Sequence, residues 1–490
     1  MKNMKYVNPV SPFEKSLLKD RSRGEYREIY DRVSFPTSAE LEALEEERRV
    51  VIEKLVQHGA AFGFNNTKVD CRGLSPGCRI CGEGNWSCLF INNRCNADCF
   101  YCPAPQDQHA EPSTNNLTFS HPGDYLDYLE KFNFKGCSIS GGEPFLVFDK
   151  TIRYIRAIKN RFGSGMYVWL YTNGLLADEP RLAALRDAGL DEIRFDIAAL
   201  GYNAEKPALA ARFIPNVTVE IPAVPHHFDR LLKALPLLGK AGVKFLNLHQ
   251  MRCTAHNAEK LLKRGYTFIH AGKLLVAESE ITALKVMLKA FEENLPIQIN
   301  YCSFVFKHTH QNLAARMRIA RDMCRPSEDI TRAGFIRELS MKGVMAEKAR
   351  QLLQDNQTSG DEYSWHPKSN ILYFRLKHWP LLRKIPGALH VGYICSSLYD
   401  RVSYANPFKE YPLNKSRKIF GERYYVMRDY ECGPVEGVLL DELSAMRDID
   451  DFDAFVSRMK TQHSLTEKDL MGLLNIRNGE FIKKGLQEYF

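Results

Sequence analysis

The chain has 490 residues, of which 44% are hydrophobic and 26% are charged, and its net charge is +8. This composition is that of an ordinary globular protein, and the length predicts one large domain with appendages or two to three domains. The mild charge excludes general polyanion binding, and no apolar run is long enough to span a membrane. Because no apolar signal segment stands near residue 1, we expect a cytoplasmic protein.

The first 88 residues divide into three parts. Residues 1–37 are polar and show no clear periodicity, so no element is predicted there. A helix is predicted from Ser38, which acts as its N-cap, to Gly59, because apolar residues recur at helical spacing. Residues 60–88 are rich in glycine and polar residues, and they predict a loop that folds around a metal rather than around a hydrophobic core.

From Ser87 the pattern alternates between strands and helices. Strands are predicted at 89–91, 137–140, 167–171, 192–197, 217–221, 245–249 and 297–302. The helices predicted between them cover 122–134, 150–162, 179–188, 204–213, 228–241 and 278–293. Such alternation indicates βαβ units and a parallel sheet. The rest of the chain mixes short strands at 371–374, 389–395 and 423–427 with a helix pair at 450–459 and 466–474, which is typical of an α+β region.

Seven of the thirteen cysteines fall between Cys71 and Cys102. Without a secretory signal, this clustering favours metal sites over disulfides. Cys95, Cys99 and Cys102 have the short spacing at which thiolates hold an iron–sulfur cluster. Three protein ligands on a four-iron cluster leave one iron open to a small molecule. The alternative for these residues is a zinc knuckle.

Cys95-x3-Cys99-x2-Cys102, with Tyr101 before the last cysteine, resembles the signature of the radical S-adenosylmethionine (radical SAM) superfamily. The sequence Gly141-Gly142-Glu143-Pro144, at the end of the next predicted strand, resembles the GGE motif of that superfamily. The resemblance covers roughly residues 87–303. It implies an α/β fold with a partial (β/α)6 TIM-like barrel in residues 87–324, an N-terminal helical and cysteine-rich extension in 1–86, and a C-terminal α+β accessory region in 325–490.

The resemblance also implies the cofactors. A [4Fe–4S] cluster on Cys95, Cys99 and Cys102 would bind S-adenosylmethionine (SAM) at its open iron and cleave it reductively. An external one-electron reductant of the flavodoxin or ferredoxin type would supply the electron. Glu143 and the carbonyl groups of Ser140 and Gly141 would accept the SAM amino group, and Gly141 and Gly142 would let the backbone approach this ligand.

Two further strand ends resemble those of the glycyl-radical-enzyme activases. These are Thr172-Asn173-Gly174 and Leu246-Asn247-Leu248-His249, which suggest Asn173 and His249 as SAM contacts. Tyr171 and Ala198 stand where those activases tend to have an acidic residue and a lysine. Arg194 or Glu220 would then supply the missing polar contacts. Because of these departures, the substrate class of the activases is not assigned to this chain.

Four cysteines precede the cluster loop: Cys71, Cys78, Cys81 and Cys88. Their spacing predicts an auxiliary metal site, for which an iron–sulfur cluster is favoured over structural zinc, and partly free loop cysteines are the remaining alternative. Cys302 ends the last predicted barrel strand. A cluster ligand, a hydrogen donor and a packing residue are all open interpretations of it, and packing is favoured.

The favoured function is therefore a radical SAM enzyme that abstracts a hydrogen atom from an unidentified substrate. Activation of a protein partner and modification of a small molecule, lipid or RNA nucleotide are the alternatives within enzymes. A non-catalytic iron–sulfur electron carrier or a zinc-dependent nucleic-acid-binding protein is the alternative outside them. Residues 367–428 hold twelve Lys/Arg against three Asp/Glu, interleaved with aromatic residues. This segment allows an anionic substrate or single-stranded nucleic acid, although an ordinary α+β surface is favoured.

Overall fold

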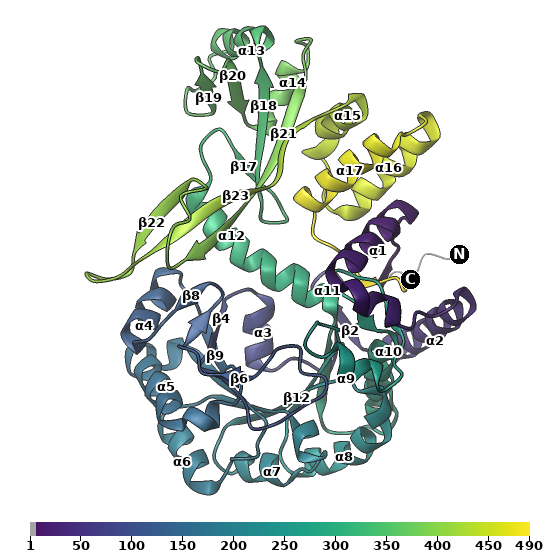
Figure 1. The fold of residues 1–490 in the computed structure, drawn as a ribbon, viewed down its shortest axis with the longest axis vertical. Helices are drawn as coiled ribbons and strands as arrows, with labels where there is room; N and C mark the ends of the chain where they lie inside the picture. The colour runs from purple at the N-terminus through teal and green to yellow at the C-terminus, as the bar shows by residue number, and fades with distance from the viewer. Residues whose placement is uncertain (1–5) are drawn as a thin grey trace. The chain divides into compact units, whose positions relative to one another are not determined.

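The computed structural model describes residues 6–490, apart from the side chain of Cys71. The chain forms two compact units (Figure 1). One contains the described residues up to Gln311 together with Lys484–Phe490, and the other comprises Asn312–Lys483. Each unit has its own sheet and its own buried core. Within residues 6–490, none of the helices has the length and apolar character that crossing a membrane requires.

The first unit is built on a run of seven parallel strands. In spatial order they are β4 (Trp86–Phe90), β9 (Gly136–Ser140), β10 (Tyr167–Thr172), β11 (Glu192–Phe195), β12 (Asn216–Pro222), β13 (Phe245–His249) and β16 (Gln298–Cys302). Spatial order therefore follows chain order, and the carboxyl ends of all seven strands lie at one edge of the sheet. In register, Glu220 pairs with Asn247, and His249 pairs with Cys302.

Amphipathic helices connect these strands. They are α4 (Pro122–Lys131), α5 (Phe148–Phe162), α6 (Glu179–Asp187), α7 (Glu205–Ala211), α8 (Phe228–Lys240) and α10 (Ala277–Glu292). In α5, for example, Ile152, Ile155 and Ile158 recur at helical spacing and are buried. Figure 1 shows α4 to α8 around the outer side of the strands. The predicted alternation of strands and helices, and the mixed α/β class, are confirmed.

The N-terminal part contains a helix that the sequence analysis did not predict. Helix α1 (Pro12–Tyr26) begins after Ser11, whose hydroxyl accepts a hydrogen bond from the Glu14 amide. The expectation of no element in residues 1–37 was wrong, because this helix is largely polar and starts from a local cap rather than from an apolar stripe. Helix α2 (Ser38–Gln57) has Thr37, not Ser38, as its N-cap.

The expected loop at residues 60–88 is also structured. Strands β2 (Ala61–Gly63) and β3 (Lys68–Cys71) extend the sheet, since β3 pairs antiparallel with β16 and β2 pairs with β3. Helix α3 (Pro76–Gly82) follows and packs against β9 and β10. The prediction of a loop was wrong because the strand pairing is made with β16, about 230 residues later in the sequence.

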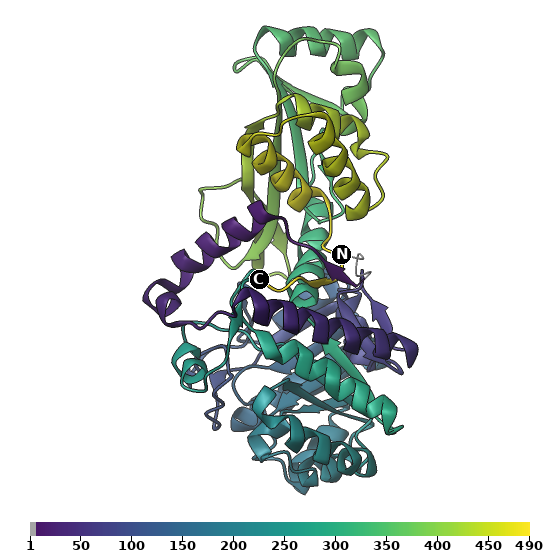
Figure 2. The same cartoon turned by 90° about the vertical axis from the view of Figure 1, so that its right-hand side faces the viewer.

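The last residues of the chain return to the first unit. Strand β24 (Leu486–Gln487) pairs in parallel with β1 (Val7–Asn8). Figure 2 shows α2 and α10 side by side near these strands. Arg48 of α2 is completely buried there, and its guanidinium donates to Glu280 of α10 and to the Gln487 carbonyl.

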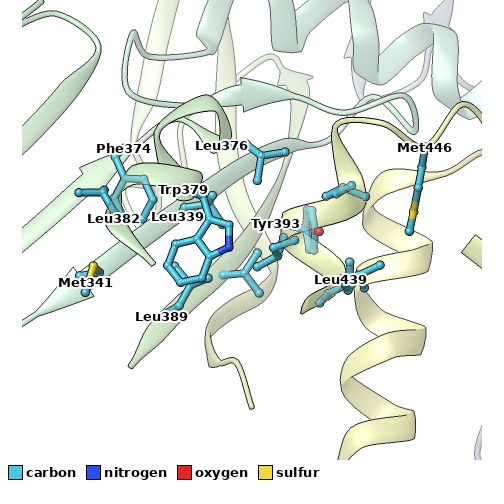
Figure 3. Close-up of a cluster of buried hydrophobic side chains, with 14 of the residues drawn as sticks. Leu339, Met341, Phe374, Leu376, Trp379, Leu382, Leu389, Tyr393, Leu439 and Met446 are labelled. Carbon is cyan, nitrogen blue, oxygen red and sulfur yellow. The ribbon is translucent and has the colours of Figure 1, made fainter. Parts of the chain in front are cut away.

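The second unit is an antiparallel sheet covered by helices. Its strands, in spatial order, are β19 (Tyr363–His366), β20 (Ile371–Phe374), β18 (Ile336–Lys342), β21 (Leu389–Tyr399), β23 (Lys418–Glu431) and β22 (Phe408–Pro412), and β17 (Asp329–Ile330) pairs with β18. Its main helices are α12 (Asn312–Met323), α13 (Val344–Asp355), α15 (Pro434–Leu443), α16 (Ile449–Gln462) and α17 (Glu467–Glu480). Figure 3 shows part of its core, in which Phe374, Trp379 and Tyr393 lie with Leu439 and Met446.

Candidate active site

The three cysteines of the predicted cluster motif lie on the loop that follows β4. A short hairpin of β5 (Asn93–Arg94) and β6 (Asp107–Gln108) closes the base of this loop. The side chains of Cys95, Cys99 and Cys102 are all half-buried. Burial, followed by the nearby Asp196 carboxylate, raises the pKa of Cys99 to about 11, and the thiols of Cys95 and Cys102 contribute to this shift. The three thiols are therefore mutual neighbours.

This set of donors fits an iron–sulfur cluster better than a single ion. Among the side chains that the structure describes, no three His, Cys, Asp or Glu residues converge closely enough to hold one metal ion. A cubane cluster binds each thiolate through a different iron, so its ligands need not meet at a point. The raised pKa of Cys99 is compatible with this use, because iron displaces the thiol proton on binding.

The two glycines of the GGE motif touch the strand exit that leads into the cysteine loop. A Cβ atom on Gly141 would collide with the Asn92 carbonyl oxygen, and one on Gly142 would collide with that of Arg94. Backbone hydrogen bonds join the same segments, from the Gly142 amide to Asn92 and from the Glu143 amide to Arg94. These glycines allow close approach of two protein segments, and the expected approach of their backbone to SAM stays a prediction.

Glu143 lies at the centre of this arrangement and is 1% exposed. Its carboxylate accepts hydrogen bonds from the Phe145 amide, the Thr172 hydroxyl and the Asn173 amide, at 2.7 to 3.0 Å. Burial raises the pKa of Glu143, and these hydrogen bonds oppose the increase. The carbonyl of Ser140, another predicted SAM contact, accepts from the Ile91 amide. Glu143 thus ties the end of β9 to the end of β10.

Asn173 connects these strand ends to the cysteine loop. Its Nδ2 atom lies 2.7 Å from Oδ1 of Asn96 and 3.5 Å from Sγ of Cys95. The structure therefore brings together Cys95, Glu143 and Asn173, which the sequence analysis had placed in three separate motifs.

Arg194, Glu220 and His249 form a second connected group on β11, β12 and β13. Nη1 of Arg194 is 2.7 Å from one Glu220 oxygen, and Nε2 of His249 is 2.6 Å from the other. Burial opposes ionisation of Glu220, but His249 and Arg194 lower its pKa well below the usual value. Arg194 also pairs with Glu192 at 2.8 Å, a partner that the sequence analysis missed. The other ring nitrogen of His249, Nδ1, is buried without a hydrogen-bond partner among the described residues.

Asp196 is a further site residue that the sequence analysis did not select. The Tyr101 hydroxyl donates to both oxygens of its carboxylate, at 3.0 and 2.9 Å. Burial raises the pKa of Asp196 to about 6, although the hydrogen bond from Tyr101 acts in the opposite direction. The position of Tyr101 within the cysteine motif was visible in the sequence, but its partner lies 95 residues away.

A segment after β13 also holds the cysteine loop. The Thr254 hydroxyl donates to the Pro103 carbonyl at 2.9 Å, and Nδ2 of Asn257 donates to the Tyr101 carbonyl at 3.1 Å. Asn257 is fully buried. No spacing or motif in the sequence points to this contact.

The cysteines that precede the motif take different positions. Cys78 and Cys81 are on α3, where their thiols interact with each other and with the thiol of Cys302. Cys88 is on β4, and its interactions are with Ser138, Glu220 and Arg194. The side chain of Cys71 lies outside the described part of the chain. The predicted four-cysteine set therefore remains a prediction.

Cys302 has polar surroundings, in contrast to the packing role favoured from the sequence. Its Sγ atom is 2.5 Å from Nζ of Lys68 and 3.2 Å from Oδ1 of Asn247. Burial raises the pKa of this thiol, but Lys68 and then His249 outweigh burial and lower the pKa to about 6.

Comparisons with known proteins identify the family of the chain. A family model described as the radical SAM superfamily matches residues 89–253. A protein of Methanocaldococcus jannaschii named "Putative glycyl-radical enzyme activating enzyme" is 31% identical over 284 residues, which are 56% of this chain and 73% of that protein. A Methanococcus aeolicus protein named "Probable GTP 3′,8-cyclase" is 34% identical over 114 residues, which are 23% of this chain and 36% of that protein.

Among solved structures, Streptococcus suis SuiB bound to S-adenosylmethionine aligns with 62% of this chain and 68% of its own, with a TM-score of 0.35 and 11% identity. The family is shown by the share of the M. jannaschii relative that this chain covers, together with the match to the family model. The chain therefore belongs to the radical SAM superfamily and is an enzyme of the kind that uses a [4Fe–4S] cluster and S-adenosylmethionine.

Proposed function

We propose that Cys95, Cys99 and Cys102 hold the catalytic [4Fe–4S] cluster and leave one iron for SAM. When bound, the cluster supplies one electron for cleavage of SAM, which leads to abstraction of a hydrogen atom from the substrate. In this proposal the six strands of a partial (β/α)6 barrel are β4, β9, β10, β11, β12 and β13, and β16 is an added strand. An external one-electron reductant of the flavodoxin or ferredoxin type is the implied partner.

The observation that carries the proposal is the hydrogen-bonded link between three motifs. Glu143 accepts from the Asn173 amide, and the Asn173 side chain reaches the loop at Asn96 and Cys95. An ionised carboxylate offers about four acceptor positions, so Glu143 retains capacity for the ammonium group of SAM beside the cysteine loop. Gly141 and Gly142 fix the distance between this carboxylate and the loop because they permit direct backbone contact.

The group of Arg194, Glu220 and His249 supports the far side of the proposed SAM site. Arg194 is held by Glu192 and Glu220 and is nearly fully buried, so it orients Glu220. Glu220 in turn holds the His249 ring, which also interacts with the Cys302 thiol. We assign the direct contacts to Glu220 and His249 and a positioning role to Arg194.

The substrate that we favour is a protein partner, as the name of the M. jannaschii relative suggests. Modification of a small molecule is the second candidate, and the relative named as a GTP cyclase favours it over a short part of the chain. We further propose that the upstream cysteine segment binds a second metal centre. A non-catalytic carrier is not favoured, because the chain belongs to an enzyme superfamily.

Anaerobic reconstitution with iron and sulfide tests the catalytic proposal. With dithionite and SAM, we expect formation of methionine and 5′-deoxyadenosine by the wild-type protein and none above background by Cys99→Ala. Equal product from the two proteins would contradict the assignment of the cluster. Transfer of deuterium from a labelled candidate substrate into 5′-deoxyadenosine would then separate a protein substrate from a small molecule.

A further inference from the structure

Three cysteine thiols from two distant segments of the chain lie together in the first unit. Cys78 and Cys81 are on α3, and Cys302 is the last residue of β16. The thiols of Cys78 and Cys81 interact electrostatically with each other and with the thiol of Cys302. Cys78 and Cys302 are 4% and 5% exposed, so this thiol cluster belongs to the interior rather than to a surface loop.

A buried cation lies among these thiols. Lys68 of β3 is 2% exposed, and its Nζ atom is 2.5 Å from Sγ of Cys302. The same ammonium interacts with Cys78 and Cys81. Burying an ammonium is costly unless negative charge compensates it. A thiolate at Cys302 supplies such charge beside Nζ of Lys68, and thiolates bound to an iron–sulfur centre would supply it as well.

A hydrogen-bond donor is also directed at one of the sulfurs. Nε2 of Gln311 lies 3.1 Å from Sγ of Cys81. Gln311 closes the π-helix Lys307–Gln311, a type of turn that is frequent at functional sites. Hydrogen bonds to the ligating sulfurs are among the features by which proteins set the potential of an iron–sulfur cluster.

The choice of metal centre follows from how thiolates bind each kind of centre. A tetrahedral zinc site needs its ligands to converge on one ion, and no three of the described metal-binding side chains do so. A polynuclear cluster accepts wider spacing because each thiolate binds its own iron. Cys88 interacts with Ser138, Glu220 and Arg194 and with the thiol of Cys137, and we leave it out of the ligand set.

We propose that Cys78, Cys81 and Cys302 bind a second iron–sulfur cluster inside the first unit, with Lys68 as its charge-compensating neighbour. The ligand set differs from the one expected from sequence, because Cys302 takes the place of Cys88. The proposal does not depend on the cluster of the Cys95 loop.

This ligand set is tested by measuring iron in a variant that lacks the three cysteines of the catalytic cluster. The full-length triple variant Cys95→Ala, Cys99→Ala, Cys102→Ala is reconstituted anaerobically, and iron and acid-labile sulfide are measured. A second four-iron cluster predicts about eight irons per chain in the wild-type protein and about four in the triple variant. Addition of Cys302→Ala should remove the remaining iron, whereas addition of Cys88→Ala should leave it.

Three outcomes would overturn the proposal. These are loss of all iron in the triple variant, iron retained with Cys302→Ala but lost with Cys88→Ala, and zinc in place of iron. If the wild-type protein and the triple variant hold the same amount of iron, the catalytic assignment fails and the second cluster stands.

Cys137→Ala, at a buried cysteine of β9, controls for the effect of a new cavity. If circular dichroism shows that Cys302→Ala is unfolded, Cys302→Val restores most of the volume and repeats the test.

The role of Lys68 has its own readout. In the triple background, Lys68→Met should retain the iron but shift the reduction potential to a more negative value, because a positive charge beside the cluster is lost. Lys68→Arg, which keeps the charge, should shift the potential less. Equal potentials in the two variants would contradict the placement of Lys68 beside the cluster.

Discussion

Individual residues in the site act mainly by joining segments. Glu143 receives three donors from the ends of β9 and β10, and Gly142 permits contact with the exit of β4. Asp196 holds Tyr101 within the cysteine motif. A substitution at one of these positions should therefore affect both ligand binding and the organisation of the loop.

Glu143→Gln is predicted to weaken SAM binding while leaving the iron content unchanged. The amide cannot satisfy all three donors and carries no charge to pair with an ammonium. Hydrogen bonds to charged groups contribute about 1.5 to 3 kcal/mol, so we expect the dissociation constant to rise roughly 10- to 150-fold. Anaerobic calorimetric titration with SAM measures it.

The matched control is Glu205→Gln, at an exposed glutamate in the first turn of α7. An unchanged dissociation constant for Glu143→Gln would show that Glu143 only organises the protein and does not contact SAM. Loss of iron together with affinity would place its main effect on the cysteine loop.

At the scale of elements, α3 brings cysteine thiols into the interior of the first unit. Ser75 caps this helix, Pro76 occupies its first turn, and Cys78 follows on the same turn. Gly77 lies directly against Glu192, Arg194 and Trp169. It is the only residue of this turn without a side chain, so the helix can approach the sheet closely at this position. The approach places the thiols of α3 near β16.

Gly77→Ala is predicted to disturb the docking of α3. The added Cβ would meet Arg194 and would lie 2.9 Å from Oε2 of Glu192, so the buried ion pair between these residues must shift. Overpacking of this kind costs about 1 to 3 kcal/mol, which urea unfolding would measure. Gly123→Ala in α4, where nothing lies within 4 Å of the new atom, is the control. Equal stability of the two variants would contradict the close contact.

At the scale of the whole molecule, the second unit is inserted before the last seven residues of the chain. These residues return to the first unit through β24 and through Phe490, whose carbonyl accepts from the amide of His270. The His270 ring stacks on Phe35 with centroids 4.4 Å apart and lies 2.9 Å from the Tyr30 hydroxyl. His270 is 4% exposed, and burial lowers its pKa.

The lowered pKa of His270 predicts a loss of stability in mild acid. The unfolded chain takes up a proton near pH 6.5 while the folded chain does not, so the contribution is complete above that pH and decreases as the pH falls toward the folded pKa. The slope is at most about 1.4 kcal/mol per pH unit. We expect His270→Gln to lose less stability than the wild-type protein between pH 7.5 and 5.5 in urea unfolding. His256→Gln, at an exposed histidine, should behave as wild type; a wild-type slope in His270→Gln would contradict the prediction.

The sequence alone determined the alternating strands and helices and the cysteine and GGE motifs. These features depend on local periodicity and on short spacing, which a single sequence displays directly. It also indicated that polar motifs such as Thr172-Asn173-Gly174 stand at strand ends. It missed α1, whose cap is local but whose helix is polar, and it treated β2, β3 and α3 as a loop.

Only the tertiary structure decided which residues meet. Cys302 lies beside Lys68, 234 residues away, because β16 and β3 pair in antiparallel register. Asp196 meets Tyr101, and Asn257 meets the cysteine loop, through contacts that no local pattern encodes. Strand register and the docking of α3 arise from packing across the whole unit. The motifs could therefore be predicted from the sequence, whereas the partners of Cys78 and Cys81 required the fold.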